Sequence, residues 1–147
     1  MLYVLDTNIL TLYRRGIEPV TRHVLAMQEQ EIATTIISVE EQLNGWQMRL
    51  RHPNTDSALA SIYAEMTSTV TFLAVLRVLT FNEGAIARYK ALQALKLNIG
   101  KMDLRIAAIA LEFGGIVVTQ NVRDFERIPG LIIEDWTRAR NGQENDI

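Results

Sequence analysis

The chain has 147 residues, of which 48% are hydrophobic and 22% charged; this composition predicts a single folded domain and excludes a disordered chain. It contains no cysteine, which excludes a disulfide framework, a thiolate metal site and a cysteine nucleophile. The net charge of −2 lacks the basic excess common in nucleic-acid-binding proteins, although a bound cation can supply positive charge locally.

Short apolar strands alternate with helical patterns along the chain. We expect strands at residues 2–5, 33–37, 77–81, 116–119 and 131–133. Apolar residues at helical spacing predict helices at residues 20–27, 39–50, 57–73, 82–95 and 103–113. Asn82 can cap the fourth helix, and Gly114 with Gly115 ends the fifth. This alternation predicts an α/β fold with a parallel sheet that is covered on both faces.

No segment suggests a membrane protein. The longest apolar run, residues 70–81, is too short to span a bilayer and contains Arg77. The first strand has no basic segment before it, as a signal peptide would. We therefore expect a soluble, cytoplasmic protein, whose polar end from Arg138 onward frays.

Acidic residues follow predicted strands or, in the case of Asp103, open the helix that leads into the strand at residues 116–119. They are Asp6, Glu40, Glu41, Asp103 and Asp124, with Asn121 three residues before the last of them. Sites in open parallel sheets form outside the carboxyl ends of the strands. Four acidic positions are therefore expected to meet at one edge of the sheet.

Each acid also has a purely structural interpretation. Asp6 or Asp103 could cap a helix. Ser38 could cap another helix, with Glu41 completing a capping box, and Asp124 could lie in a surface turn. The convergence of four acids on one edge is what favours a functional site over four separate structural roles.

Clustered carboxylates point to a hard divalent cation. The acids repel one another, and one would stay protonated unless a cation compensated their charge. Carboxylate, amide and water ligands suit Mg²⁺ or Mn²⁺. Zn²⁺ fits less well, because His23 and His52 lie outside the cluster and are expected at the surface. A site of this kind can activate water and neutralise charge on a phosphodiester.

Four motifs carry a resemblance to a known family. They are LDTN after the first strand, E-x-L-x-G at residues 41–45, IGKMDLRIAAIAL around Asp103, and VVTQNVRDFERIPGL around Asp124. Together they resemble PIN-domain nucleases, and within these the VapC-type toxins of prokaryotic type II toxin–antitoxin pairs. The resemblance implies a PIN-like three-layer α/β/α fold with a central parallel sheet of about five strands, a nuclease domain at residues 1–137 and a polar tail at residues 138–147.

The resemblance also implies an activity and its residues. It implies a Mg²⁺- or Mn²⁺-dependent RNA endonuclease that usually dimerises and is inhibited by a small cognate antitoxin, which inserts a segment into the active-site groove. Asp6 and Asp103 match the principal metal ligands, whereas Glu41 and Asp124 match acids that can act through water. The residues expected to support the site or bind substrate are Asn8, Arg14, Lys101, Thr119, Asn121 and Arg123. Lys101 and Met102 depart from the small or aromatic residues common before Asp103 in relatives.

The second acid can be either Glu40 or Glu41. Adjacent helical residues diverge by about 100°, so both cannot face one cation. Glu41 shares a face with Gly45, four residues later, where glycine leaves room for metal, water and substrate. We therefore predict that Glu41 is the second acid and that Glu40 leans away.

Other side chains near the edge have two interpretations. Four basic residues could contact RNA phosphates or be ordinary solvated charges: Arg14, Arg15, Lys101 and Arg123. Tyr13 and Trp46 could stack on a base, although the helical spacing of Trp46 is more typical of a core residue. Residues 57–79 hold more apolar side chains than one buried face requires, which predicts contact with a second copy or the antitoxin.

Two alternative functions fit part of the pattern. A metal-dependent phosphatase with an aspartyl nucleophile commonly has a second acid two residues after the first, and Asn8 occupies that position here. A catalytically weak PIN-fold binding module would not need every acid, yet all four positions are filled. Neither alternative accounts for the residues as well as an RNA endonuclease, and the sequence does not specify which RNA is cleaved.

Overall fold

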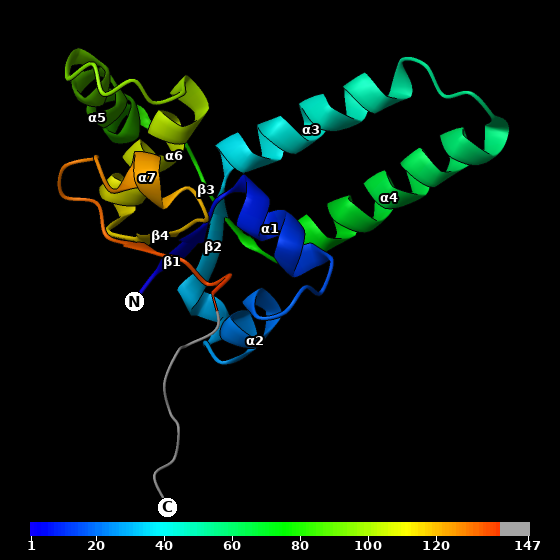
Figure 1. Cartoon of the computed structure of the whole chain (residues 1–147), viewed down its shortest axis with the longest axis horizontal. Coiled ribbons are helices and arrows are strands. Elements are labelled where there is room, and N and C mark those ends of the chain that lie inside the picture. The colour runs from blue at the N-terminus through cyan, green and yellow to red at the C-terminus, as the bar shows by residue number, and fades with distance from the viewer. Residues whose placement is uncertain (139–147) are drawn as a thin grey trace, which may run out of the picture.

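A five-stranded parallel sheet forms the centre of the computed structural model, which describes residues 1–138 (Figure 1). The strands follow the order β3-β2-β1-β4-β5, and all four pairings are parallel. Their bounds are β1 Tyr3–Leu5, β2 Ile32–Thr35, β3 Arg77–Leu79, β4 Ile116–Val118 and β5 Ile133–Glu134. The α/β class and the parallel sheet of five strands are confirmed.

Helices connect successive strands and cover both faces of the sheet. They are α1 Thr7–Arg14, α2 Val20–Leu25, α3 Ile36–Leu50, α4 Asp56–Ala74, α5 Glu83–Ala94, α6 Lys101–Phe113 and α7 Val122–Phe125, with a 3₁₀ turn at Glu29–Glu31. None of the helices among the described residues is long and apolar enough to cross a membrane. The predicted polar tail falls almost wholly at residues 139–147, outside the described part of the chain.

Two apolar cores lie on opposite faces of the sheet. Val4 belongs to a cluster formed mainly with α5 and α6, whereas the next residue, Leu5, belongs to a cluster formed with α1 and α2. Successive side chains of a strand point to opposite faces, so one buried strand contributes to both cores. The predicted three-layer α/β/α arrangement follows directly from this packing.

Local signals account for most helix boundaries. The side chain of Asn82 accepts a hydrogen bond from the Ala85 N–H at 2.9 Å and caps α5, as predicted. Gly114 adopts φ +67° and ends α6, a conformation that glycine takes without steric cost. The helix α1 begins directly after Asp6, and the short helix α7 follows β4; neither span was assigned from the sequence.

The start of α3 differs from the prediction. Ile36 and Ile37 were expected to end the second strand, but they form the first turn of α3. Thr35 caps this helix, because its hydroxyl accepts a hydrogen bond from the Ser38 N–H at 3.2 Å. Ser38 is therefore not the cap, so the alternative interpretation of Glu41 as part of a capping box is wrong.

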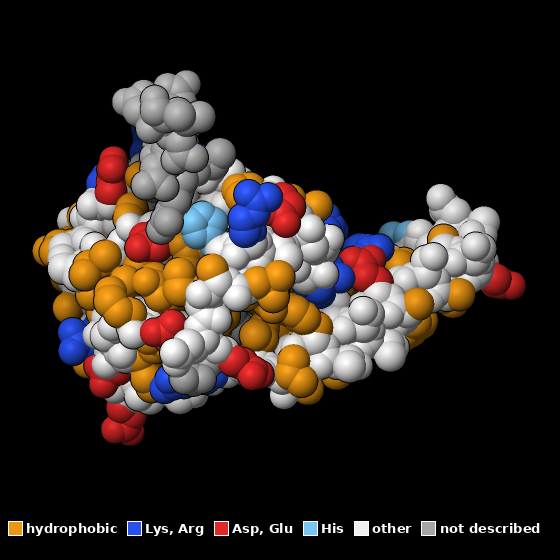
Figure 2. All heavy atoms as spheres, turned by 90° about the horizontal axis from the view of Figure 1, so that it is seen from below, with side chains coloured by type: hydrophobic (Ala, Val, Ile, Leu, Met, Phe, Trp, Pro, Cys, Tyr) orange, Lys and Arg blue, Asp and Glu red, His pale blue; other side chains and the backbone are white. Residues whose placement is uncertain are grey.

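The antiparallel helices α3 and α4 extend away from the sheet (Figure 1). Trp46 is 5% exposed, in agreement with a core position. Other apolar side chains of these two helices are exposed: Leu43, Met48, Tyr63 and Val70. Hydrophobic side chains also gather on the face seen from below in Figure 2. The excess of apolar side chains predicted for residues 57–79 is thus left partly open to solvent.

Candidate active site

Asp6 lies where β1 meets α1 and is only 5% exposed. Its Oδ1 accepts a hydrogen bond from the Ile9 N–H at 3.0 Å, so Asp6 does cap a helix. The pKa of Asp6 is raised from 3.8 to about 6. Burial is the largest cause and the charges of Asp103 and Glu41 add to it, whereas hydrogen bonds from Thr119 and Ile9 act in the opposite direction. The cap alone does not account for a buried carboxyl group beside two other acids.

Glu41 faces the start of α1 from the second turn of α3. Its Oε1 accepts a hydrogen bond from Thr7 Oγ1 at 2.7 Å, and the Ser38 hydroxyl lies 3.0 Å from the same Thr7 oxygen. Thr7 directly follows Asp6, so this bond ties Glu41 to the end of β1. A Cβ atom placed on Gly45 would have no neighbour within 4 Å, which leaves space on the face that Glu41 shares with Gly45.

Asp103 lies in the first turn of α6 and is partly buried. Burial raises the pKa of this carboxyl, and the charges of Glu41 and Asp124 add to the increase. A hydrogen bond from Asn121 acts in the opposite direction and lowers the pKa. The charges of Glu41 and Asp103 therefore influence each other, although Glu41 lies on α3, which follows β2, and Asp103 lies on α6, which precedes β4.

Asn121 links the last two acids. Its amide Nδ2 donates hydrogen bonds to Asp103 Oδ2 at 3.4 Å and to Asp124 Oδ2 at 3.0 Å. A guanidinium nitrogen of Arg127 lies 2.8 Å from the other oxygen of Asp124. These hydrogen bonds, from Asn121 and then from Arg127, hold the pKa of Asp124 below its ordinary value. Asp124 thus stays ionised near Asp103, whose pKa is raised.

The donor set suits a small hard cation that keeps part of its water shell. No three His, Asp or Glu side chains within residues 1–138 stand close enough to hold a cation unaided. Mg²⁺ is commonly held by only one or two carboxylates together with water. His23 stacks on Trp136 with ring centroids 5.2 Å apart, and His52 is exposed after α3. As predicted, the histidines stand outside the acidic group.

The other predicted site residues divide into two sets. Thr119 is fully buried at the end of β4, where its hydroxyl accepts a hydrogen bond from the Asn121 N–H. Asn8, Lys101 and Arg123 are exposed. Arg14 is different: it lies in the last turn of α1, its side chain is 14% exposed, and its guanidinium pairs with Glu65 at 3.3 Å.

Three residues of the site were not predicted by name. Thr7 bonds to Glu41, Ser38 bonds to Thr7, and Arg127 bonds to Asp124. Thr7 lies inside the LDTN motif, and Arg127 follows Asp124 by three residues, a spacing at which helical side chains meet. Ser38 carried no such signal, because its predicted role as a helix cap depended on an incorrect helix start. Of the two residues expected to stack on a base, Tyr13 packs edge-to-face with Phe72 and Trp46 is in the core.

The chain is similar in sequence and fold to several known proteins. The family model of the PIN domain matches residues 3–131. Ribonuclease VapC2 from Rickettsia felis is 30% identical over 141 residues, which cover 94% of this chain and 100% of that protein. The crystal structure of VapBC2 from Rickettsia felis, bound to a DNA fragment from their promoter, is similar with a TM-score of 0.77 and 25% identity over 92% of this chain and 99% of that chain. The crystal structure of DNA-bound VapBC from Salmonella typhimurium is similar with a TM-score of 0.74 and 27% identity, over 92% of this chain and 99% of that chain.

Proposed function

The chain belongs to the PIN-domain family, as its four motifs predicted, and we propose that it is an endoribonuclease acting as the toxin of a toxin–antitoxin pair. Its similarity to Ribonuclease VapC2, which extends over the whole of that protein, supports this function. The observation that carries the proposal is that the charges of Asp6, Glu41 and Asp103 act on one another, with Asp6 buried and Asp124 joined to Asp103 through Asn121.

We further propose that Asp6 and Asp103 bind Mg²⁺ or Mn²⁺, with Glu41 and Asp124 reaching it through water. When bound, the cation supplies a water of lowered pKa and neutralises charge on the scissile phosphodiester. Thr7 holds one oxygen of Glu41 at 2.7 Å, which leaves the other oxygen for a water or a substrate hydroxyl. Asn121 fixes Asp103 and Asp124 relative to each other. Exposed Lys101 and Arg123 are suited to contact RNA phosphates.

The proposed partners are RNA, a small cognate antitoxin and a second copy of the chain. Proteins similar in fold have been solved as VapBC assemblies, which supports an antitoxin partner. The molecule offers apolar surface for protein contacts, including a hollow of about 240 Å³ lined by residues that include Tyr13, Phe72 and Leu76. Exposed apolar side chains on α3 and α4 add to this surface. Contiguous apolar surface of this kind typically marks protein-binding sites.

RNA cleavage by the purified chain tests the proposed function. We expect cleavage with Mg²⁺ or Mn²⁺, loss of cleavage with a chelator, and loss of cleavage in Asp103→Asn prepared in parallel. The same preparations should not hydrolyse a simple phosphomonoester, which separates the nuclease from the phosphatase alternative. Equal cleavage by the wild type and Asp103→Asn would mean that the acids do not act on RNA. Absence of cleavage at every cation concentration would contradict the ribonuclease function.

A further inference from the structure

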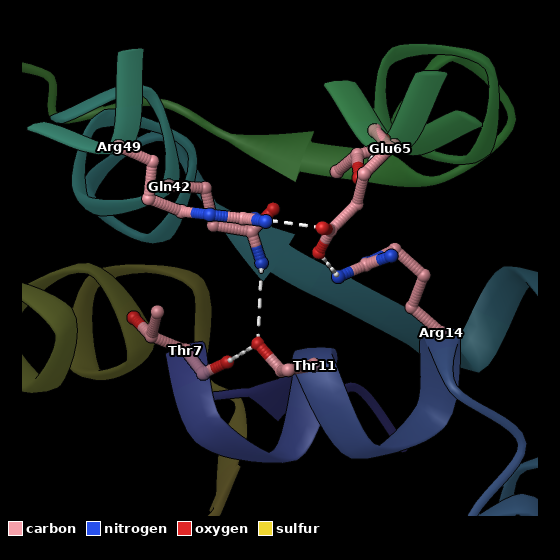
Figure 3. Close-up of polar contacts among 7 residues, drawn as sticks. Thr7, Thr11, Arg14, Gln42, Arg49 and Glu65 are labelled. Carbon is pink, nitrogen blue, oxygen red and sulfur yellow. Dashed lines mark hydrogen bonds and ion pairs between the residues drawn. The ribbon is translucent and has the colours of Figure 1, made fainter. Parts of the chain in front are cut away.

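A row of polar contacts runs along the interface between α1 and α3 (Figure 3). Thr7, Thr11 and Arg14 lie four and then three residues apart and so share one face of α1. On α3, Glu41 bonds to Thr7 and Gln42 bonds to Thr11, while Arg49 is joined to Arg14 through Glu65 of α4. Helices more often pack through apolar side chains, and we call this row the α1–α3 polar ladder.

The first contacts of the ladder lie at the active site. Thr7 Oγ1 donates a hydrogen bond to Glu41 at 2.7 Å, and its main-chain carbonyl accepts one from the Thr11 hydroxyl at 3.0 Å. The Gln42 amide Nε2 donates in turn to Thr11 Oγ1 at 3.4 Å. Gln42 directly follows Glu41 on α3, so this second contact fixes the rotation of α3 beside the catalytic carboxylate.

The far end of the ladder is closed by Glu65 from α4. Its two oxygens accept from two arginines, with 3.3 Å to Arg14 on α1 and 2.7 Å to Arg49 on α3 (Figure 3). Bonding to Arg49 first, and then to Arg14, lowers the pKa of Glu65, so the carboxylate stays charged. One side chain thus joins three helices at the end of α1 opposite Asp6.

The alignment of α1 and α3 depends on few bonds. Arg14 Nε and Gln42 Oε1 are buried and have no hydrogen-bond partner among the described residues. These atoms therefore form no additional hydrogen bonds that could hold the interface together. Removal of Glu65 would leave the largely buried Arg14 guanidinium without its carboxylate partner. A charged group in such a position is costly unless it is paired.

We propose that Glu65 and Gln42 are positioning residues for RNA cleavage, because the α1–α3 polar ladder holds Glu41 against Thr7. This proposal rests on the proposed ribonuclease function. In this role Arg14, which was expected to support the site or bind substrate, forms an internal ion pair with Glu65. Displacement of a catalytic group by about 1 Å can lower the rate by as much as 100-fold, so remote bonds that fix a helix have kinetic consequences.

The principal test compares Glu65→Gln with Glu112→Gln. Glu112 is a matched control, because its side chain is 28% exposed against 29% for Glu65 and it also accepts from an arginine at 2.7 Å, on the α5–α6 side of the molecule. In Glu65→Gln we expect kcat to fall by about tenfold with KM unchanged, whereas Glu112→Gln behaves like the wild type. Thr11→Val is a milder second variant, and we expect it to lower kcat in the same direction.

Two further measurements separate positioning from general destabilisation. In a Thr7→Val background, where the bond to Glu41 is already absent, Glu65→Gln should cause no additional loss of kcat. Hydrogen exchange of main-chain amides in the first turns of α3 should be faster in Glu65→Gln than in Glu112→Gln. The exchange measurement does not depend on activity, so it tests the structural role of Glu65 even if the wild type cleaves no RNA. Absence of cleavage by the wild type would refute the ribonuclease function, which is a separate conclusion.

Several outcomes would overturn the positioning role. Kinetics of Glu65→Gln and Thr11→Val equal to those of Glu112→Gln would do so. A full additional loss in the Thr7→Val background would show that Glu65 acts elsewhere. A rise in KM alone would instead make Glu65 a determinant of RNA binding. Unchanged exchange in α3 would show that the ladder does not restrain this helix.

Discussion

Replacement of Asp6 by asparagine should stabilise the cation-free protein. Burial raises the pKa of Asp6 from 3.8 to about 6, so the folded state binds more protons than the unfolded state between these values. The free energy of unfolding therefore decreases as pH rises through this window, and the full penalty of the ionised carboxylate is present at pH 7. Asparagine removes that charge and still offers a side-chain oxygen to the Ile9 N–H.

The magnitude follows from the pKa shift. A shift of about two units at roughly 1.4 kcal/mol per unit predicts that Asp6→Asn raises the free energy of unfolding by about 3 kcal/mol above pH 7. The difference from the wild type should vanish below about pH 3, where Asp6 is protonated in both the folded and the unfolded state. Asp6→Ala is the control for the helix cap: it removes the same charge but should be about 1 kcal/mol less stable than Asp6→Asn.

Urea unfolding at several pH values in the presence of a chelator measures these differences. Addition of Mg²⁺ should then stabilise the wild type and have much less effect on Asp6→Asn, because a ligand that binds only the folded state raises its stability. The reasoning would be refuted if Asp6→Asn were less stable than the wild type at neutral pH, or if the difference did not change with pH. Equal stabilisation of both proteins by Mg²⁺ would remove Asp6 from the cation site.

Three further predictions concern the second acid, the chemistry and the partners. Glu41→Gln should abolish RNA cleavage while Glu40→Gln retains most of it, with both variants folded by circular dichroism, because Glu41 bonds to Thr7 beside Asp6; the reverse result would move the second acid to Glu40. Metal-activated water should leave 5′-phosphate and 3′-hydroxyl ends, and detection of 2′,3′-cyclic phosphates by mass spectrometry would contradict this chemistry. Light scattering at tens of micromolar should give more than the monomer mass, because apolar side chains such as Val70 are exposed; a strictly monomeric mass would argue against self-association.

Local sequence signals determined the type and order of most elements. Apolar runs alternating with helical patterns predicted the parallel sheet, because βαβ connections bring successive strands into the same direction. Asn82 and Gly114 marked a helix start and a helix end through their own side chain or backbone preference. Asp6, Glu41 and Asp124 were predicted at one edge because they follow strand ends, and Asp103 because it opens the helix that leads into the fourth strand. In the structure the charges of Glu41 and Asp124 both act on Asp103, and those of Glu41 and Asp103 act on Asp6.

Tertiary packing decided what local signals could not. Ile36 and Ile37 are β-branched and suit a strand, yet Ile37 is buried in the core from the first turn of α3, and the Thr35 cap fixes that start. Arg14 was predicted to be available to RNA, but Glu65, distant by 51 residues, occupies it. The pKa of Asp6 likewise depends on its burial and on Asp103 and Glu41, which belong to other segments. The residue types at the site follow from the sequence, whereas their charge, pairing and orientation arise from contacts between segments that only the folded chain brings together.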